Sequence, residues 1–189
     1  MIPATFDPCP EILIAKGNHL MKKISAICVM TLVALIVVCA ASAAPSKFAG
    51  AWVLNRSKSA GLTGALANAE IRLIVTQDDK QITAEQKVII KGREQPSQEF
   101  IYKLDGGETT AEVVRPMAGT MKLKARWIEY SKTLELASII TGDNAGKETT
   151  ITTREQWQLR ENGKVLQVVR TRETPQGKKL FGLHFDKQE

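Results

Sequence analysis

The larger part of this chain contains no cysteine. The 189 residues include Cys9, Cys28 and Cys39, and all three precede residue 44. Residues 44–189 can therefore form no disulfide, and they lack the thiolates on which many structural zinc sites depend. Their stability must come from an ordinary hydrophobic core, and a segment of about 146 residues is long enough to bury one.

Histidine and the usual catalytic arrangements are equally scarce. Residues 44–189 contain one histidine, His184, and no Gly-x-Ser-x-Gly motif. A Ser-His-Asp site would have to be built on His184, and a zinc or other transition-metal site would lack ligands. No pair of carboxylates with the pattern of a glycosidase can be identified. We therefore expect no enzyme, no cofactor and no metal site.

One long hydrophobic run is present, near the N-terminus. Lys22 and Lys23 follow Met21, residues 24–41 are almost wholly apolar, and Ala-Ser-Ala ends at Ala43. This order is typical of a secretory signal peptide. We interpret residues 21–43 as that peptide, cleaved after Ala43, which predicts a periplasmic or secreted protein. The alternative is a retained membrane anchor, but small residues and a proline follow the run instead of a basic cluster.

Residues 1–20 fit neither a signal peptide nor a folded element, because they hold three prolines and two acidic residues without periodicity. We expect Met21 to be the true start and residues 1–20 to be an over-extended gene prediction. Residues 44–189 then form the single working domain.

The working domain is mildly basic. Of the 26 Lys and Arg and the 20 Asp and Glu residues, three and two precede residue 44, which leaves a net charge of +5. Such a balance suits either weak attraction to an anionic envelope surface or a soluble surface of mixed charge. Lys122, Lys124 and Arg126 form a row on one strand face, without interleaved aromatic residues. We expect a solvated face there, and no nucleic-acid binding.

Alternation of apolar and polar residues dominates the working domain, which is typical of half-buried strands. Ten segments show it, around residues 48–54, 71–75, 82–90, 100–104, 111–115, 121–127, 134–140, 151–159, 166–170 and 180–185. Short connections such as Asn162-Gly163 carry turn residues. Residues 63–70 interrupt the pattern and predict either two helical turns capped by Thr63 or a plain loop. The fold class is therefore all-β, an antiparallel up-and-down meander of eight to ten strands.

A long meander leaves two exposed edges, and closure into a barrel removes them. We therefore predict a closed barrel. With about eight strands, its interior is either filled by side chains or has room for one small ligand.

The opening of the working domain resembles a known pattern. Residues 48–54 read Phe-Ala-Gly-Ala-Trp-Val-Leu, which is similar to the Phe-x-Gly-x-Trp-x-Leu opening of the calycins, the lipocalins and fatty-acid-binding proteins. With residues 55–59 and the spaced motifs of residues 157–177, the chain resembles a group of small exported bacterial lipocalin-like proteins of unsettled function. The likeness spans nearly all of residues 44–189.

This resemblance implies a lipocalin-like barrel in which Trp52 plugs one end and Gly50 lets the first strand bend over it. It also implies that a late arginine, Arg170 or else Arg172, lies across the indole. Fatty-acid-binding proteins hold the ligand carboxylate with an Arg-x-Tyr pair. Here the sequence is Arg170-Thr171-Arg172, and the missing tyrosine argues against fatty-acid binding of that kind.

Glu155 shares the predicted inner face with Ile151 and Trp157. Burying an unpaired carboxylate is costly, and Arg170 on the following strand is a suitable partner. Three interpretations stay open: a core ion pair, a polar anchor in a ligand cavity, or exposure through a bulge.

The apolar inner face and the scarcity of catalytic groups predict a binding protein for a small hydrophobic or amphipathic ligand. The residues expected to contact it are Phe100, Tyr102, Met121, Trp127, Trp157 and, as a polar contact, Arg170. The alternative is a structural or interaction barrel of the cell envelope with a packed core and no ligand. In either case we expect a monomer.

Overall fold

The alternating sequence forms strands along almost the whole of the described chain. The computed structural model describes residues 46–114, 116–129 and 132–189, so residues 1–20, the proposed signal peptide at 21–43 and Arg115 lie outside it. The strands within these limits are β1 (Gly50–Leu54), β2 (Glu70–Gln77), β3 (Gln81–Ile90), β4 (Arg93–Glu94), β5 (Gln98–Lys103), β6 (Thr109–Val113), β7 (Gly119–Ile128), β8 (Thr133–Asn144), β9 (Lys147–Arg160), β10 (Val165–Thr174) and β11 (Gly177–Lys187).

The strands pair as an antiparallel meander. Their hydrogen-bonded order is β4-β3-β2-β1-β11-β10-β9-β8-β7-β6, and β5 pairs with β3. Most neighbours are consecutive in the chain, and β1 pairs with β11, so the first and last strands meet. The predicted meander is confirmed. The described residues hold eleven strands, one more than the predicted maximum, because the two-residue strand β4 forms after β3.

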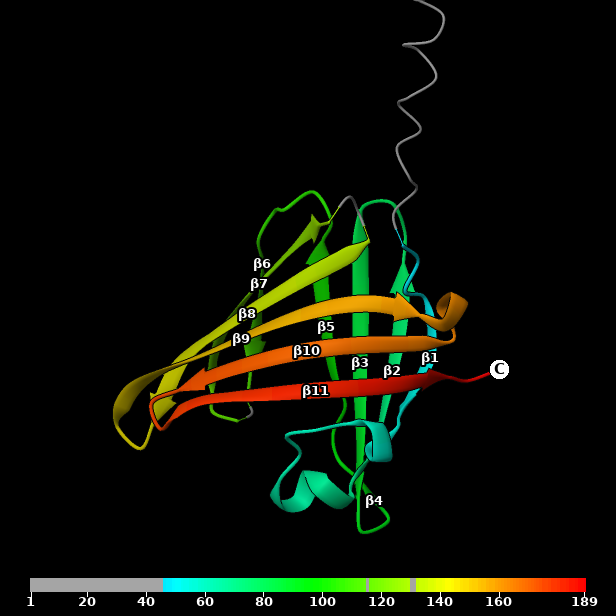
Figure 1. The fold of residues 1–189 in the computed structure, drawn as a ribbon. Helices are drawn as coiled ribbons and strands as arrows, with labels where there is room; N and C mark the ends of the chain where they lie inside the picture. The colour runs from blue at the N-terminus through cyan, green and yellow to red at the C-terminus, as the bar shows by residue number, and fades with distance from the viewer. Residues whose placement is uncertain (1–45, 115, 130–131) are drawn as a thin grey trace, which may run out of the picture. The chain divides into compact units, whose positions relative to one another are not determined.

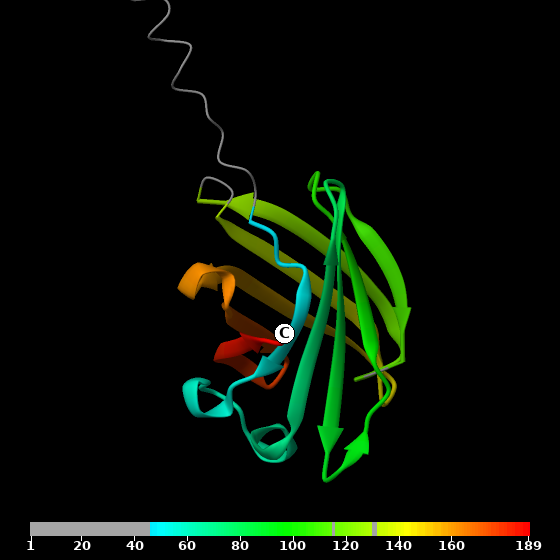
Figure 2. The same ribbon diagram turned by 90° about the vertical axis from the view of Figure 1, so that its right-hand side faces the viewer.

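The sheet curls until its two halves face each other. Figure 1 shows β8 to β11 crossing in front of β2, β3 and β5, and Figure 2 shows the same halves from the side. In the described residues no backbone ladder joins β5 to β6, although β5 lies against β7. The Thr109 hydroxyl of β6 donates a hydrogen bond of 2.5 Å to the Ile101 carbonyl of β5. The closed-barrel prediction requires a complete hydrogen-bonded ring. The described sheet does not form one, because no ladder joins β5 to β6.

Trp52 is fully buried in the core. Its indole Nε1 donates a hydrogen bond of 3.0 Å to the Phe48 carbonyl. Gly50 has a φ of 142°, a conformation that favours glycine. The cation above the indole is Lys187, whose Nζ lies 5.3 Å from the ring centroid.

The expectation that Arg170 or Arg172 covers Trp52 is therefore wrong, and strand register explains why. In the β1–β11 pair Lys187 lies directly opposite Trp52, whereas Arg170 lies opposite Glu155 in the β9–β10 pair.

The interruption at residues 63–70 contains a five-residue 3₁₀ helix, η2 (Gly64–Asn68), and the Thr63 side chain makes no capping hydrogen bond. The other 3₁₀ helices of the described residues are η1 (Arg56–Lys58) and η3 (Glu161–Gly163). No described helix is long and apolar enough to cross a membrane.

Candidate functional site

The register of β8, β9 and β10 arranges inward-facing side chains in rows across the sheet. The three central rows are Leu134–Trp157–Val168, Leu136–Glu155–Arg170 and Ser138–Thr153–Arg172. Because inward positions recur at every second residue, the rows stack along the strands. The interior thus changes from wholly apolar to charged over two rows.

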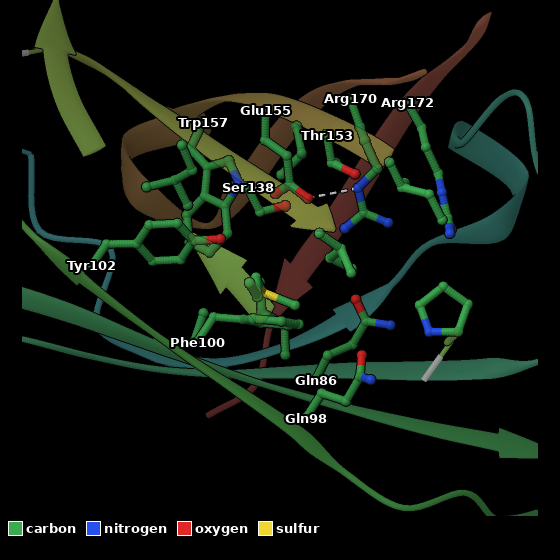
Figure 3. Close-up of a pocket in the computed structure, with 18 of the residues that line it drawn as sticks. Gln86, Gln98, Phe100, Tyr102, Ser138, Thr153, Glu155, Trp157, Arg170 and Arg172 are labelled. Atoms are coloured by element: carbon green, nitrogen blue, oxygen red, sulfur yellow. Dashed lines mark hydrogen bonds and ion pairs between the residues drawn. The ribbon is translucent and has the colours of Figure 1, made fainter. Parts of the chain in front are cut away.

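These rows form one wall of a cavity of about 160 Å³ that is partly open to the outside. Phe100, Tyr102 and Met121 contribute the apolar part of other walls. Seven polar side chains also line the cavity. The wall formed by the rows contributes Ser138, Thr153, Glu155, Arg170 and Arg172, and the other two are Gln86 and Gln98. Figure 3 shows Tyr102 and Trp157 toward one end of the cavity and Arg170 and Arg172 toward the other, with Glu155 between them.

The structure brings together most of the side chains that were predicted to contact a ligand. Those that line the cavity are Phe100, Tyr102, Met121, Trp157 and Arg170. Trp127 is not among the lining residues. Its ring stacks on Phe48 with 6.0 Å between centroids, and Phe48 packs edge-on against Trp157 at 5.8 Å. Trp127 therefore belongs to the aromatic packing behind Trp157.

Glu155 holds two partners in the cavity wall. Arg170 Nε donates a hydrogen bond of 2.6 Å to Glu155 Oε1, and Trp157 Nε1 donates one of 2.6 Å to Oε2. The side chains of Glu155 and Arg170 are 14% and 27% exposed. The predicted core ion pair is present, and it lies in the wall of the cavity. Exposure through a bulge is excluded by this geometry.

Tyr102 faces the same charges across the cavity. Burial raises the pKa of its phenol far above the ordinary value, the negative charge of Glu155 raises it further, and Arg170 opposes both effects. The phenol therefore stays protonated at physiological pH, as a neutral polar group in a mostly apolar wall.

Arg172 is a lining residue that the predicted ligand set does not include. Its Nε is buried and has no hydrogen-bond acceptor among the described residues. The pKa of its guanidinium lies below the ordinary value because burial removes the group from water and because the Arg170 cation lies nearby. The alternation of the sequence could have predicted this position, because Val168, Arg170 and Arg172 occupy every second position of β10 and so face the same side of the sheet. Ser138 and Thr153 follow from the same rule.

The outer face carries the basic row as expected. Lys122 and Lys124 lie 3.3 and 3.6 Å from Glu108 oxygens, and Arg126 lies 2.7 Å from Glu135. These three cations are well exposed, so the row is a solvated strand face whose charge is largely balanced. Within the described part of the chain, no cluster of three or more His, Cys, Asp or Glu side chains could hold a metal ion.

Comparison with solved structures finds the zebrafish ileal bile acid-binding protein, crystallised with cholic acid. The alignment covers 76% of this chain and 100% of that protein, with 16% identity and a TM-score of 0.43. Likeness at this level supports no inference about family or ligand. No family model matches the chain, and no curated protein matches it.

Proposed function

We propose that residues 44–189 bind a small hydrophobic or amphipathic molecule inside a lipocalin-like barrel. One observation carries the proposal: a partly open cavity whose walls combine Phe100, Met121 and Trp157 with the Glu155–Arg170 pair. Binding sites for small molecules combine apolar walls with fixed polar groups, and this cavity contains both. The Thr109–Ile101 hydrogen bond across the gap between β5 and β6 supports the barrel description.

The cavity volume limits the size of the ligand. A volume of about 160 Å³ is close to that of an engineered apolar cavity of about 150 Å³ that holds benzene. The buried part of the ligand is therefore comparable to a six-membered ring or a short alkyl chain.

A cavity-filling substitution tests the proposal with 1-octanol as a neutral probe. Ala84 is buried and lines the cavity, so Ala84→Leu reduces the space inside. Ala137→Leu is the matched control, because Ala137 lies between the inward Leu136 and Ser138 and points to the other face. In the full chain, 1-octanol should raise the melting temperature of the wild type and the control, but not of Ala84→Leu. A wild type that does not respond to saturating 1-octanol contradicts the proposal.

Material from the natural source provides an independent test. Native mass spectrometry of protein purified from its own envelope should show a small molecule that co-purifies. Repeated absence of any such molecule would count heavily against a binding role.

Export is part of the same proposal and is supported by the composition of residues 21–43. Expression of the full chain in a bacterial host, followed by N-terminal sequencing, should yield a chain that begins at Ala44. An uncleaved chain that stays with the membrane fraction would favour the anchor instead.

A second function is a structural or interaction barrel that takes no ligand. The observation in its favour is also the cavity volume, since pockets for drug-sized molecules measure about 300–1,000 Å³, above the 160 Å³ found here. This alternative predicts that no apolar probe shifts the melting temperature of any variant.

A further inference from the structure

Tyr102 carries a buried hydroxyl for which the described residues supply no hydrogen-bond acceptor. The residue is 6% exposed and lines the cavity, and no hydrogen bond between described residues involves its side chain. Buried tyrosine hydroxyls usually have a partner, and a buried donor without one costs free energy. The phenol therefore needs an acceptor that enters the cavity.

The position of Tyr102 leaves room for such an acceptor. Figure 3 shows its hydroxyl directed away from its own strand, β5, and toward the side chains of Trp157 and Ser138. The next inward pair along β5 and β3 is Phe100 and Ala84, and both line the cavity. Because the Ala84 side chain is a single methyl group, this row leaves space in front of the Phe100 ring and beside the phenol.

The chemistry of the wall restricts what the acceptor can be. Glu155 is the carboxylate among the described lining residues, and its two oxygens accept hydrogen bonds from Arg170 and Trp157. Burial and then the charge of Glu155 raise the pKa of the Tyr102 phenol, and the opposing effect of Arg170 is smaller. The phenol is therefore a donor, and a further negative charge beside it is unfavourable. A neutral acceptor fits this position.

We propose that the ligand carries a neutral carbonyl group that accepts a hydrogen bond from the Tyr102 hydroxyl, while its hydrocarbon part packs against Phe100, Met121 and Trp157. The proposal rests on the binding function argued above and names the chemical class of the ligand. A carbonyl suits this site better than an alcohol, because an alcohol brings a donor that needs an acceptor of its own. A cavity of about 160 Å³, close to the size of one that holds benzene, fits a cyclic ketone with a six-membered ring.

The test compares cyclohexanone with methylenecyclohexane, which has the same shape and a CH₂ group in place of the oxygen. Both are titrated into the full chain in sealed tubes, and binding is followed by the NMR signals of the protein amides. Tyr102→Phe removes the hydroxyl and keeps the ring. It should weaken cyclohexanone by about two- to tenfold, the range of one net hydrogen bond. The affinity for methylenecyclohexane should not fall.

Thr153→Val is the matched control, because it also removes one hydroxyl from the cavity wall with little change of shape. Thr153 lines the cavity without a hydrogen bond from its hydroxyl to another described residue, and Figure 3 shows it beside Arg170, toward the other end from Tyr102. Cyclohexanone should bind this variant as tightly as it binds the wild type. This result would separate a contact at Tyr102 from the general polarity of the cavity.

The carbonyl stretch of bound cyclohexanone provides a second readout that a purely structural role of Tyr102 would not move. In the wild type the infrared band should lie below its position in hexane, because a hydrogen bond weakens the C=O bond, and in Tyr102→Phe it should return toward that position. The wild-type band decides the question even if Tyr102→Phe does not fold, since a band at the hexane position refutes the hydrogen bond.

The outcomes separate this inference from the function on which it rests. If methylenecyclohexane binds and Tyr102→Phe leaves the affinity for cyclohexanone unchanged, the contact with Tyr102 is refuted and the binding function stands. Equal losses of cyclohexanone affinity in Tyr102→Phe and Thr153→Val also refute a contact specific to Tyr102. Failure of both probes to bind the wild type contradicts the binding function itself.

Discussion

Glu155→Gln should destabilise the fold because Glu155 serves two buried donors at once. The carboxylate accepts hydrogen bonds of 2.6 Å from both Arg170 Nε and Trp157 Nε1. An amide of the same shape has one acceptor oxygen, so its NH₂ group must face one of the two donors. The substitution therefore leaves one donor unpaired and leaves Arg170 beside Arg172 without a counter-charge.

The expected size of the effect follows from the burial of the pair. An unpaired buried donor costs about 1–3 kcal/mol, and breaking a fully buried ion pair costs about 3–5 kcal/mol. The side chains here are 14% and 27% exposed, which allows partial solvation of the remaining charge. We expect the free energy of unfolding to fall by about 2–3 kcal/mol.

Urea denaturation at neutral pH, followed by circular dichroism, measures this change. Arg170→Met removes the cation that loses its partner, so the double variant should be more stable than Glu155→Gln alone. Glu70→Gln is the control, because Glu70 also bonds an arginine, Arg72, at 2.6 Å, but its side chain is 44% exposed; its midpoint should barely move. A Glu155→Gln midpoint equal to that of the wild type, or costs that add in the double variant, would refute the reasoning.

Two further predictions concern Tyr102 and Gly50. The pKa of Tyr102 is raised above its ordinary 10.0 in the folded protein. The contribution of the protonated phenol to the free energy of unfolding is therefore complete below about pH 10 and declines above it, by up to about 1.4 kcal/mol per pH unit. Urea titrations should therefore show a shallower alkaline decline for Tyr102→Phe than for the wild type, and equal slopes would contradict the burial of the phenol. Gly50→Ala should cost about 1–3 kcal/mol, since φ is 142° and the new Cβ would lie 3.0 Å from Lys187 Cε. Gly182→Ala, where a Cβ meets no atom within 4 Å, should have little effect, and similar losses in both variants would show that local strain is not the cause.

The alternation of the sequence predicts the face that each residue occupies, and for β9 and β10 this was enough to predict residues that line the cavity. Glu155 and Trp157 share a face because they are two residues apart, and Arg170 meets Glu155 because the connecting turn sets the register. Nothing beyond period two and the cost of a lone buried carboxylate was needed. The same rule, applied to Arg172, would have added the second arginine of the cavity wall.

Alternation does not predict the depth of a residue along the axis of the sheet, and Trp127 shows the consequence. It shares the inner face of β7 with Met121, which lines the cavity, yet it lies six residues further along and packs on Phe48. Lys187 was missed for a related reason, since its place over Trp52 depends on the pairing of the first and last strands. Contacts between distant strands, the unpaired edge between β5 and β6 and the volume of the cavity all require coordinates.

The missing ladder between β5 and β6 makes this edge the place where local opening of the sheet is easiest. Elsewhere in the described sheet, moving two neighbouring strands apart ruptures a ladder of main-chain hydrogen bonds, whereas here the principal obstacle is the single Thr109 hydroxyl. Local opening at such a seam is a small fluctuation that leaves the remaining ladders intact. Among the strand amides, deuterium uptake should accordingly be fastest along this margin.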